Sequence, residues 1–165
     1  MEKILISACL VGENTTYKKT NNYTKDIELL KKHFELVLIC PEVMGGLTIP
    51  RNPSEIKPCE SGKISTRVFD NLGKDVTDNF NLGANKVLTA KRYWNIKLAV
   101  LKDESPSCGV HQIHNGYFLN VLKSGQGITT RLLKSKGVKV YSEKEIEQLL
   151  IDRGFKINKV EAKNN

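Results

Sequence analysis

Three of the four cysteines in this chain follow short apolar segments, in the pattern expected at the ends of parallel β-strands. Cys9 follows residues 4–8, Cys40 follows residues 36–39, and Cys108 comes a few residues after 98–101. Unbroken apolar segments of this length are typical of strands in a parallel sheet that is covered on both faces. Because the carboxyl ends of such strands line one crevice, we expect these three thiols to lie close together. The fourth, Cys59, lies in a loop rich in Pro, Ser and Lys, outside this pattern.

Three thiolates around one point have three roles open to them. A 4Fe-4S cluster normally has four cysteine ligands, so three would leave one iron free for an exogenous ligand. Zinc could be bound by the three thiolates and a water molecule, or with His111 or His114 as the fourth ligand. Free cysteines are also common as small buried hydrophobic residues. The spacing does not decide among the three, because the chain has no compact Cys-x-x-Cys motif.

Predicted strands alternate with predicted helices along the chain, and these elements must position the cysteines. Apolar residues recur at helical spacing over residues 24–34, with Thr24 as the N-cap, and again in a long helix capped by Asp75. The other predicted elements are short strands at 64–69, 116–121 and 138–141, a helix after the glycine turn 125–127, and a final helix capped by Ser142. This alternation predicts a single three-layer α/β domain with a mostly parallel, Rossmann-like sheet over residues 1–155, and a polar C-terminal tail over 156–165.

The composition fits a domain that does not need its cysteines for stability. A chain of 165 residues can bury a core without disulfides or a structural metal. The start Met1-Glu2-Lys3-Ile4 has no signal-peptide pattern and no apolar segment is long enough to span a bilayer, so we expect a cytoplasmic protein without membrane partners. In that reducing compartment, thiols are reactive, metal-bound or buried more often than paired. The net charge of +8 permits nucleic-acid binding, but the lysines are spread along the chain and do not favour it.

The segments around the cysteines form a specific set of motifs. In chain order they are Ile6-Ser7-Ala8-Cys9-Leu10-Val11-Gly12, Cys40-Pro41-Glu42 with Gly45-Gly46-Leu47 and Pro50-Arg51-Asn52-Pro53, Asp75-Val76-Thr77 with Phe80 and Gly83-Ala84, Ser105-Pro106-Ser107-Cys108-Gly109, and Gly125-Gln126-Gly127-Ile128-Thr129. Together they resemble the uncharacterised-domain family DUF523, whose characterised members are thiouracil desulfidases. The resemblance extends over almost the whole chain, from about residue 4 to about residue 143.

The resemblance implies a cofactor and a reaction. The family cysteines that match Cys9, Cys40 and Cys108 bind a 4Fe-4S cluster whose fourth iron is open. The family reaction removes the sulfur of a thiolated pyrimidine such as 2-thiouracil and gives uracil and sulfide. A soft thiocarbonyl sulfur suits an open iron, and its coordination makes the ring carbon more electrophilic toward water. The implied partners are therefore a small thiolated nucleobase and sulfide, and the cluster becomes favoured over zinc or a non-catalytic module.

Two residues match the family's catalytic positions. Glu42 comes two residues after Cys40 and is the predicted general base for the attacking water, although a salt-bridging surface acid is the alternative. Ser105 is the predicted proton relay or hydrogen-bond donor to the substrate. Ser107 is the predicted supporting residue, because it is next to Cys108 and could hydrogen-bond a cluster sulfur. Either serine could instead only shape the Ser-Pro turn.

The sequence contains further candidates for substrate binding. Gly127 and Thr129 lie where a glycine turn leads into a helix, and backbone N–H groups there could bind a carbonyl oxygen or a small anion. Arg51 could extend from the long loop into the pocket, or it could pair with Glu55 and stiffen that loop. We therefore predict that Ser107, Gly127, Thr129 and Arg51 contact the substrate.

The chain departs from the family pattern at one position. Many members have a further cysteine in the loop after the first strand, at about the position of Thr15. Any role of that thiol in redox chemistry or sulfur transfer is therefore absent. His111 and His114 are interpreted as polar residues of a loop or strand edge. A thiolated tRNA is the less favoured substrate, because relatives that act on RNA tend to carry an additional domain, for which this chain is too short.

Overall fold

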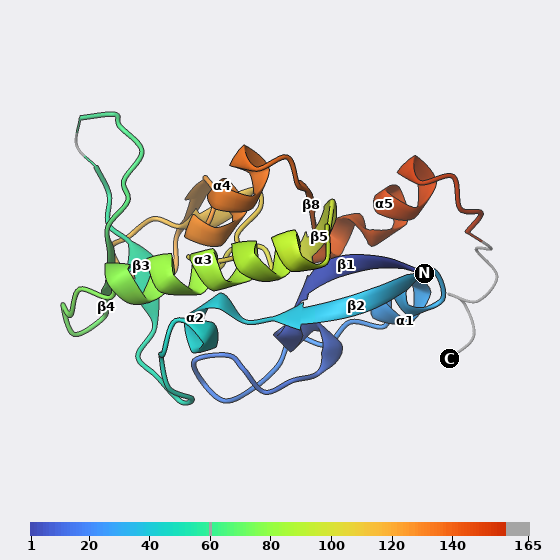
Figure 1. The fold of residues 1–165 in the computed structure, drawn as a ribbon. Coiled ribbons are helices and arrows are strands. Elements are labelled where there is room, and N and C mark those ends of the chain that lie inside the picture. Colours follow the sequence, from blue (N-terminus) through green and yellow to red (C-terminus); the bar gives the residue numbers. More distant parts are fainter. Residues whose placement is uncertain (60, 158–165) are drawn as a thin grey trace.

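A parallel four-stranded sheet forms the centre of the computed structural model, which describes residues 1–59 and 61–157 (Figure 1). The strand order is β2-β1-β5-β8, with β1 at Glu2–Ser7, β2 at Phe34–Ile39, β5 at Leu98–Leu101 and β8 at Lys139–Ser142. Each neighbouring pair is parallel, and Leu5 in the middle of β1 pairs with Val37 on one side and Ala99 on the other. The expected mostly parallel sheet is therefore confirmed.

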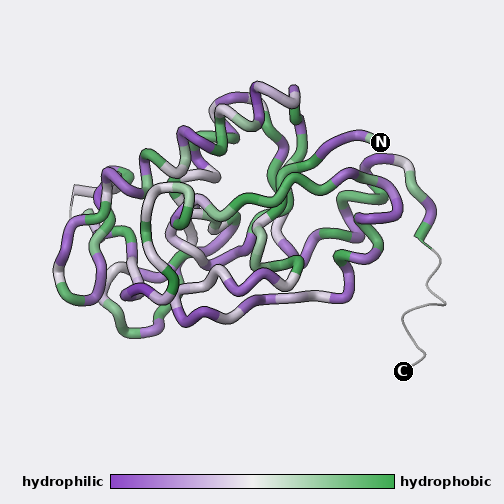
Figure 2. Tube along the Cα trace, turned by 60° about the horizontal axis from the view of Figure 1, so that its bottom comes forward, coloured by the Kyte–Doolittle hydropathy of each residue, from purple (hydrophilic) through white to green (hydrophobic). Residues whose placement is uncertain are grey.

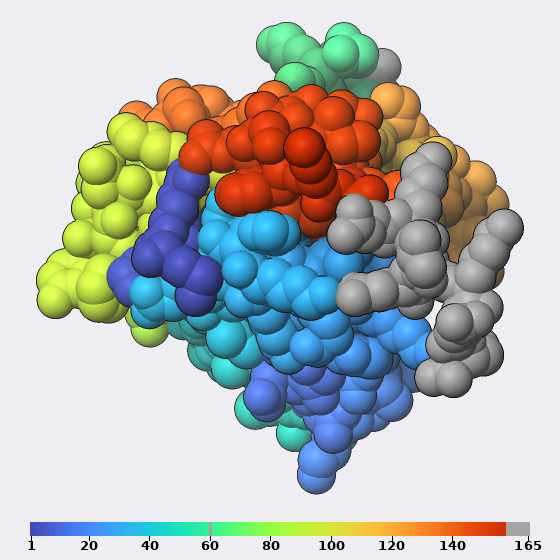
Figure 3. Space-filling model, turned by 90° about the vertical axis from the view of Figure 1, so that its right-hand side faces the viewer, coloured from blue at the N-terminus to red at the C-terminus, as the bar shows by residue number. Residues whose placement is uncertain are grey.

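Helices cover both faces of this sheet because its strands carry apolar side chains on both faces. Ile4 and Ile6 pack with α1 (Ile27–Lys31) and α5 (Ile146–Asp152), whereas Leu5 faces the opposite way. The second face is covered by α3 (Thr77–Tyr93) and α4 (Ile128–Ser135). Figure 2 shows the hydrophobic strands running together through the middle of the molecule, and Figure 3 shows α5 lying over the light-blue segment that contains α1. These three layers confirm the predicted α/β architecture.

Two small antiparallel hairpins lie outside the central sheet. They are β3 (Ser54–Ile56) with β4 (Val68–Asp70), and β6 (Gln112–His114) with β7 (Leu122–Ser124). Figure 1 places β3 and β4 at the end of the molecule opposite the N-terminus, beyond the carboxyl ends of the central strands. The hairpins therefore border the crevice where the predicted site residues converge.

Several predicted elements differ from the observed ones. The segment 116–121 is the turn between β6 and β7 and not a strand, because Gly116, Phe118 and Asn120 all have left-handed backbone angles that an extended strand excludes. In place of a strand over 64–69, the structure has β4 at Val68–Asp70. The predicted helix over 24–34 is a single short helix, since Phe34 already belongs to β2.

The starts of two other helices lie close to the predicted caps. The N-cap of α3 is Val76 and not Asp75, although Oδ1 of Asp75 accepts a hydrogen bond from the N–H of Thr77 (3.0 Å). Ser142 forms a capping box with Glu145 at the short 3-10 helix Glu143–Glu145, which leads into α5. Among the residues of the predicted tail, 158–165 lie outside the described residues, whereas Ile157 packs against the core beside Phe155. In the described part of the chain, no helix is long and apolar enough to span a membrane.

Candidate active site

Cys9, Cys40 and Cys108 all line one cavity of about 760 Å³ at the carboxyl ends of the central strands. Cys9 lies in a short 3-10 helix, Ala8–Val11, that follows β1, and Cys40 is the N-cap of the four-residue helix α2, Pro41–Met44. Cys108 lies in the loop after β5. Because β2, β1 and β5 are neighbours in the sheet, the three thiols come together from positions far apart in the sequence.

The surroundings of Cys9 and Cys108 disfavour ionisation of these two thiols. Burial raises the pKa of Cys108 to about 12, and the nearby Cys40 and Cys9 raise it as well, against the effect of hydrogen bonds with Ser7 and Ser107. Burial also raises the pKa of Cys9, although a hydrogen bond with Asn22 and the charge of Lys102 oppose this. A bound cationic group would stabilise the thiolates, as metal ligation does in general.

The chemistry of these donors fits an iron-sulfur cluster. Within residues 1–59 and 61–157, no three Cys, His, Asp or Glu side chains lie close enough together to bind one ion. Iron-sulfur clusters are held by cysteine thiolates, and three of them would leave one iron of a 4Fe-4S cluster without a protein ligand. Three soft thiols around one cavity therefore match the donor set that such a cluster requires.

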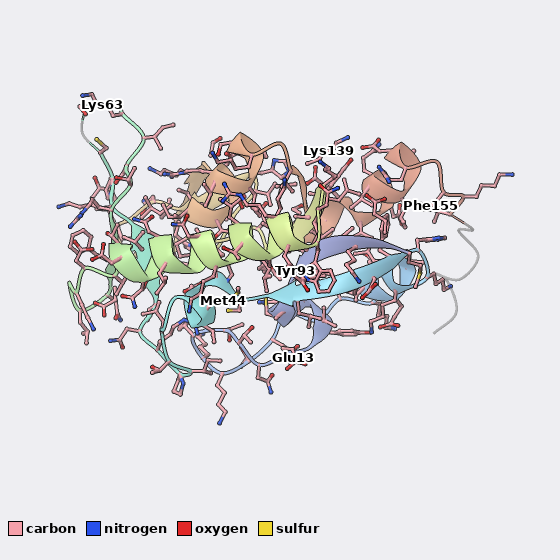
Figure 4. All side chains as sticks on the ribbon, viewed as in Figure 1. Glu13, Met44, Lys63, Tyr93, Lys139 and Phe155 are labelled. Atoms are coloured by element: carbon pink, nitrogen blue, oxygen red, sulfur yellow. The ribbon has the colours of Figure 1, made fainter. Side chains whose placement is uncertain are left out.

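Close backbone packing fixes the segment that carries Cys40. A Cβ atom at Gly83 of α3 would overlap the carbonyl oxygen of Pro41 and would lie 2.7 Å from its carbonyl carbon. At Gly45, a Cβ atom would lie 2.9 Å from the carbonyl carbon of Asn79, whose Nδ2 donates a hydrogen bond to the Gly45 carbonyl (2.9 Å). Figure 4 shows Met44 on α2 beside α3. The two helices touch through their backbones, and this contact places Pro41 and the residue that follows it.

Glu42 lies in the first turn of α2 and connects two parts of the cavity wall. Its Oε1 accepts a hydrogen bond from Nε of Arg51 (3.3 Å), and its Oε2 accepts one from Oγ of Ser107 (3.0 Å). The guanidinium also donates to the carbonyls of Thr15 (2.9 Å) and Thr48 (3.3 Å). Arg51 therefore pairs with Glu42 and not with Glu55, and it fixes the carboxylate at the cavity.

Ser105, Ser107 and Glu42 form a continuous chain of hydrogen bonds. The hydroxyls of the two serines are 2.9 Å apart, and Oγ of Ser105 accepts the N–H groups of Ser107 (3.2 Å) and Cys108 (3.1 Å). Because Ser107 donates its proton to Glu42, Ser105 donates its own proton to Ser107. Ser107 is also 3.6 Å from the sulfur of Cys108. The buried Ser107 thus connects the two residues predicted to be catalytic.

One buried carboxylate, not singled out by the sequence, organises the loop that carries Cys108. Oδ1 of Asp103 accepts four backbone N–H groups, from Glu104 (3.0 Å), Val110 (2.8 Å), His111 (2.9 Å) and Gln112 (3.1 Å). Burial acts to raise the pKa of Asp103, but these hydrogen bonds outweigh it and lower the pKa below its ordinary value. The available signal was an acidic residue almost directly after a buried strand, at the same edge of the sheet as the cysteines.

Gly127 and Thr129 hold the Cys108 loop from behind and do not line the cavity. The N–H of Gly127 donates to the carbonyl of Gly109 (2.9 Å), and the N–H of Thr129 donates to that of Ser107 (2.9 Å). A Cβ atom at Gly127 would lie 2.7 Å from the backbone nitrogen of Cys108. The backbone donors at this helix start are therefore engaged with protein carbonyls.

The remaining candidates are divided between the cavity and the surface. His114 and Thr15 line the cavity, and Nδ1 of His114 lies 3.2 Å from the carbonyl oxygen of Glu104. His111 is outside it and pairs with Glu145 (2.7 Å). The cavity is also lined by residues that the sequence did not single out, among them Tyr17, Glu55 and Phe118. Each of these lies in a loop or small hairpin, where sequence periodicity carries little information.

Three comparisons relate this chain to known proteins. Residues 4–145 match the family model described as 2-thiouracil desulfurase. The chain is 35% identical over 150 residues to the uncharacterized protein YbbK of Bacillus subtilis (strain 168), covering 89% of this chain and 99% of the relative. The structure of the 4Fe-4S-dependent thiouracil desulfidase TudS (DUF523Vcz) is similar with a TM-score of 0.83 and 35% identity, covering 93% of this chain and 99% of that one. The chain belongs to the 2-thiouracil desulfurase family.

Proposed function

We propose that this protein removes the sulfur from a small thiolated pyrimidine such as 2-thiouracil and releases uracil and sulfide. Membership of the 2-thiouracil desulfurase family and the likeness to a thiouracil desulfidase support the reaction. The observation that carries the proposal is the hydrogen-bonded chain of Glu42, Ser107 and Ser105, which lines the same cavity as three cysteines.

The thiols of Cys9, Cys40 and Cys108, which all line the cavity, would bind a 4Fe-4S cluster. When bound, the cluster supplies an iron without a protein ligand, a Lewis acid with affinity for the soft thiocarbonyl sulfur. Lys102 lines the same cavity and pairs with Glu143 (2.8 Å). Its positive charge acts to lower the pKa of Cys9, against the opposing charge of Glu143.

Glu42 is the general base for the attacking water, and Arg51 holds its carboxylate in position. The reaction exchanges C=S for C=O: water supplies the oxygen, the carbon-sulfur bond breaks, and the two protons of water leave with the sulfur as hydrogen sulfide. No oxidant or reductant is required. Once Glu42 has taken up a proton, the hydroxyls of Ser107 and Ser105 turn to donate in the opposite direction, and the proton passes through Ser107 to Ser105 and from there to the departing sulfur.

The test compares variants of the protein purified without oxygen. Glu42→Gln is expected to retain iron and acid-labile sulfide but to lose about 10²–10⁴-fold in turnover of 2-thiouracil, as loss of a general base does. Cys108→Ser is expected to lose the iron. Glu13→Gln is the matched control, since Glu13 is exposed and lies outside the cavity (Figure 4). Full activity of Glu42→Gln would contradict the assigned base, and full iron content of Cys108→Ser would contradict the ligand set.

A second pair of variants tests the proton path. Ser107→Ala removes the hydroxyl that links Glu42 to Ser105, so it is expected to lower kcat as strongly as Ser105→Ala does. If Ser105 acts only through this chain, the double variant loses no more than either single one. If the loss in kcat of the double variant equalled the product of the two single losses, the two serines would act independently.

A further inference from the structure

The turn between β6 and β7 contributes an aromatic residue to the lining of the cavity. Phe118 lines the cavity and is 37% exposed. Its neighbours in the turn, Tyr117 and Leu119, are 61% and 69% exposed and do not line the cavity. Phe118 and Asn120 of this turn therefore face the site, and the two apolar residues that flank Phe118 do not.

A buried carboxylate fixes the conformation of this turn. Glu55 in β3 is only 8% exposed, and its Oε1 accepts the N–H groups of Gly116 (2.9 Å) and Phe118 (3.3 Å). Gly116 has a φ of +93°, and a Cβ atom there would overlap the carbonyl oxygen of Ile56, so the turn lies directly against the end of β3. The turn is thus held at two points.

The backbone of Phe118 itself has a conformation that a phenylalanine rarely adopts. Its φ is +56°, in the left-handed region that is unfavourable for residues with a large side chain. Such a conformation persists only where the surroundings enforce it, and it is more common at functional sites than elsewhere. Here the hydrogen bond from the N–H of Phe118 to Glu55 stabilises it.

The aromatic ring of Phe118 is also free to stack on a ligand in the cavity, as far as the described residues show. The ring of Tyr17, which lines the cavity too, already carries the Nζ of Lys18 at 5.5 Å from its centroid. No aromatic or cationic side chain in the described part of the chain stacks against the ring of Phe118. A flat aromatic face in the wall of the cavity matches one face of a planar heterocycle.

We propose that Phe118 stacks on the pyrimidine ring of the substrate and that Glu55 is the positioning residue that sets its orientation. The proposal rests on the proposed function and adds a determinant of substrate affinity to it. Stacking acts on the pyrimidine ring, which substrate and product share, and not on the sulfur. It therefore increases the affinity for substrate and product equally. Removal of the aromatic ring should therefore raise KM with little change in kcat.

The experiment measures KM and kcat for 2-thiouracil, and in parallel the Kd of uracil by isothermal titration calorimetry, on the cluster-loaded protein. Phe118→Ala is expected to raise both KM and Kd about tenfold, in line with the usual loss when an aromatic side chain that stacks on a base is removed. Phe118→Tyr retains the ring and should restore both values. Leu119→Ala, an apolar truncation one residue along the same turn, should change neither.

Glu55 provides a second, independent test. Glu55→Gln keeps an oxygen that accepts both N–H groups and should behave as the native protein, whereas Glu55→Ala should raise KM and the Kd of uracil as Phe118→Ala does. If Phe118→Ala had the KM and the Kd of the native protein, the stacking would be overturned. Turnover of 2-thiouracil by the native protein would still support the proposed function. Binding of uracil that depends on Phe118, without turnover of 2-thiouracil, would uphold the stacking and overturn the desulfidase. Absence of both would overturn both.

Discussion

The two segments that carry Cys40 and Cys108 meet at one cavity but are fixed in different ways. The Cys40 segment is held by contact between backbones, which glycines at 45 and 83 permit. The Cys108 segment is held by hydrogen bonds, four of them to a single carboxylate oxygen of Asp103. The first arrangement is sensitive to added volume and insensitive to pH, whereas the second is sensitive to pH and to loss of one acceptor. Each arrangement fixes a cysteine that we propose as a cluster ligand beside a residue that we propose as catalytic.

The largest effect is expected from Gly83→Ala. The added methyl group would overlap the Pro41 carbonyl, so α2 and α3 would have to separate. We expect a loss of more than about 3 kcal/mol in the free energy of unfolding, because overpacking against backbone cannot be relieved by a rotamer change. Iron content should fall as well, since Cys40 precedes Pro41 directly. Urea unfolding without oxygen and iron analysis measure the two effects.

Gly125→Ala is the matched control for this prediction. Its added methyl group would lie 2.9 Å from the end of the Ile113 side chain, which can move. A loss of about 1 kcal/mol or less is therefore expected. Equal losses in the two variants would show that the contact between α2 and α3 is not a tight one.

Asp103→Ala comes next and tests the Cys108 segment. Four N–H groups would lose their shared acceptor, and we expect a loss of about 2–3 kcal/mol, the range for hydrogen bonds to a charged group and for buried donors left without a partner. Asp103→Asn keeps a carbonyl oxygen and should lose less. Urea unfolding of both variants at neutral pH, with amide hydrogen exchange of residues 104–112, measures the effect. Unchanged exchange in Asp103→Ala would contradict the role of this carboxylate.

The same residue predicts a pH dependence. The pKa of Asp103 is lower in the folded protein than its ordinary value of 3.8, so the charged carboxylate stabilises the fold fully at pH values above 3.8. That contribution is lost as the pH falls through the lower folded pKa. The difference in stability between the native protein and Asp103→Asn should therefore shrink in acid. The corresponding difference for Gly83→Ala should not depend on protonation.

The sequence predicted the regular part of the molecule well, because that part depends on periodicity. Unbroken apolar segments such as 98–101 identified the buried strands, and the strand ends brought Cys9, Cys40 and Cys108 to one edge. The motif around Gly83 was part of the resemblance, but only the structure shows its physical reason, the approach of α3 to Pro41. Close contact between distant backbones has no local sequence pattern.

Irregular segments were predicted less well. The apolar residues at 116–121 resemble a strand, yet tertiary hydrogen bonds to Glu55 bend them into a turn. Gly127 and Thr129 lie at a helix start, as predicted, but their N–H groups donate to the Cys108 loop. Asp103 was overlooked for the same reason, because its four partners are set by the path of the loop and not by spacing.

The smallest effect is expected from Glu143→Gln, which weakens the outer part of the Cys108 support. Oε2 of Glu143 accepts the N–H of Asp103 (2.8 Å), and Oε1 pairs with Lys102 (2.8 Å). Gln keeps an acceptor for the amide but loses the charge. We therefore expect a loss of about 1 kcal/mol in the free energy of unfolding, the upper range for a partly exposed pair.

Glu104→Gln is the matched control, because its carboxylate is 4.0 Å from the same Lys102 and its removal should cost less than about 0.5 kcal/mol. Urea unfolding at low and high salt distinguishes the two variants: the loss in Glu143→Gln should decrease in salt, whereas the larger loss in Asp103→Ala should persist. If Glu143→Gln lost no more than Glu104→Gln, the ion pair would add nothing, and the Cys108 loop would depend on its hydrogen bonds alone.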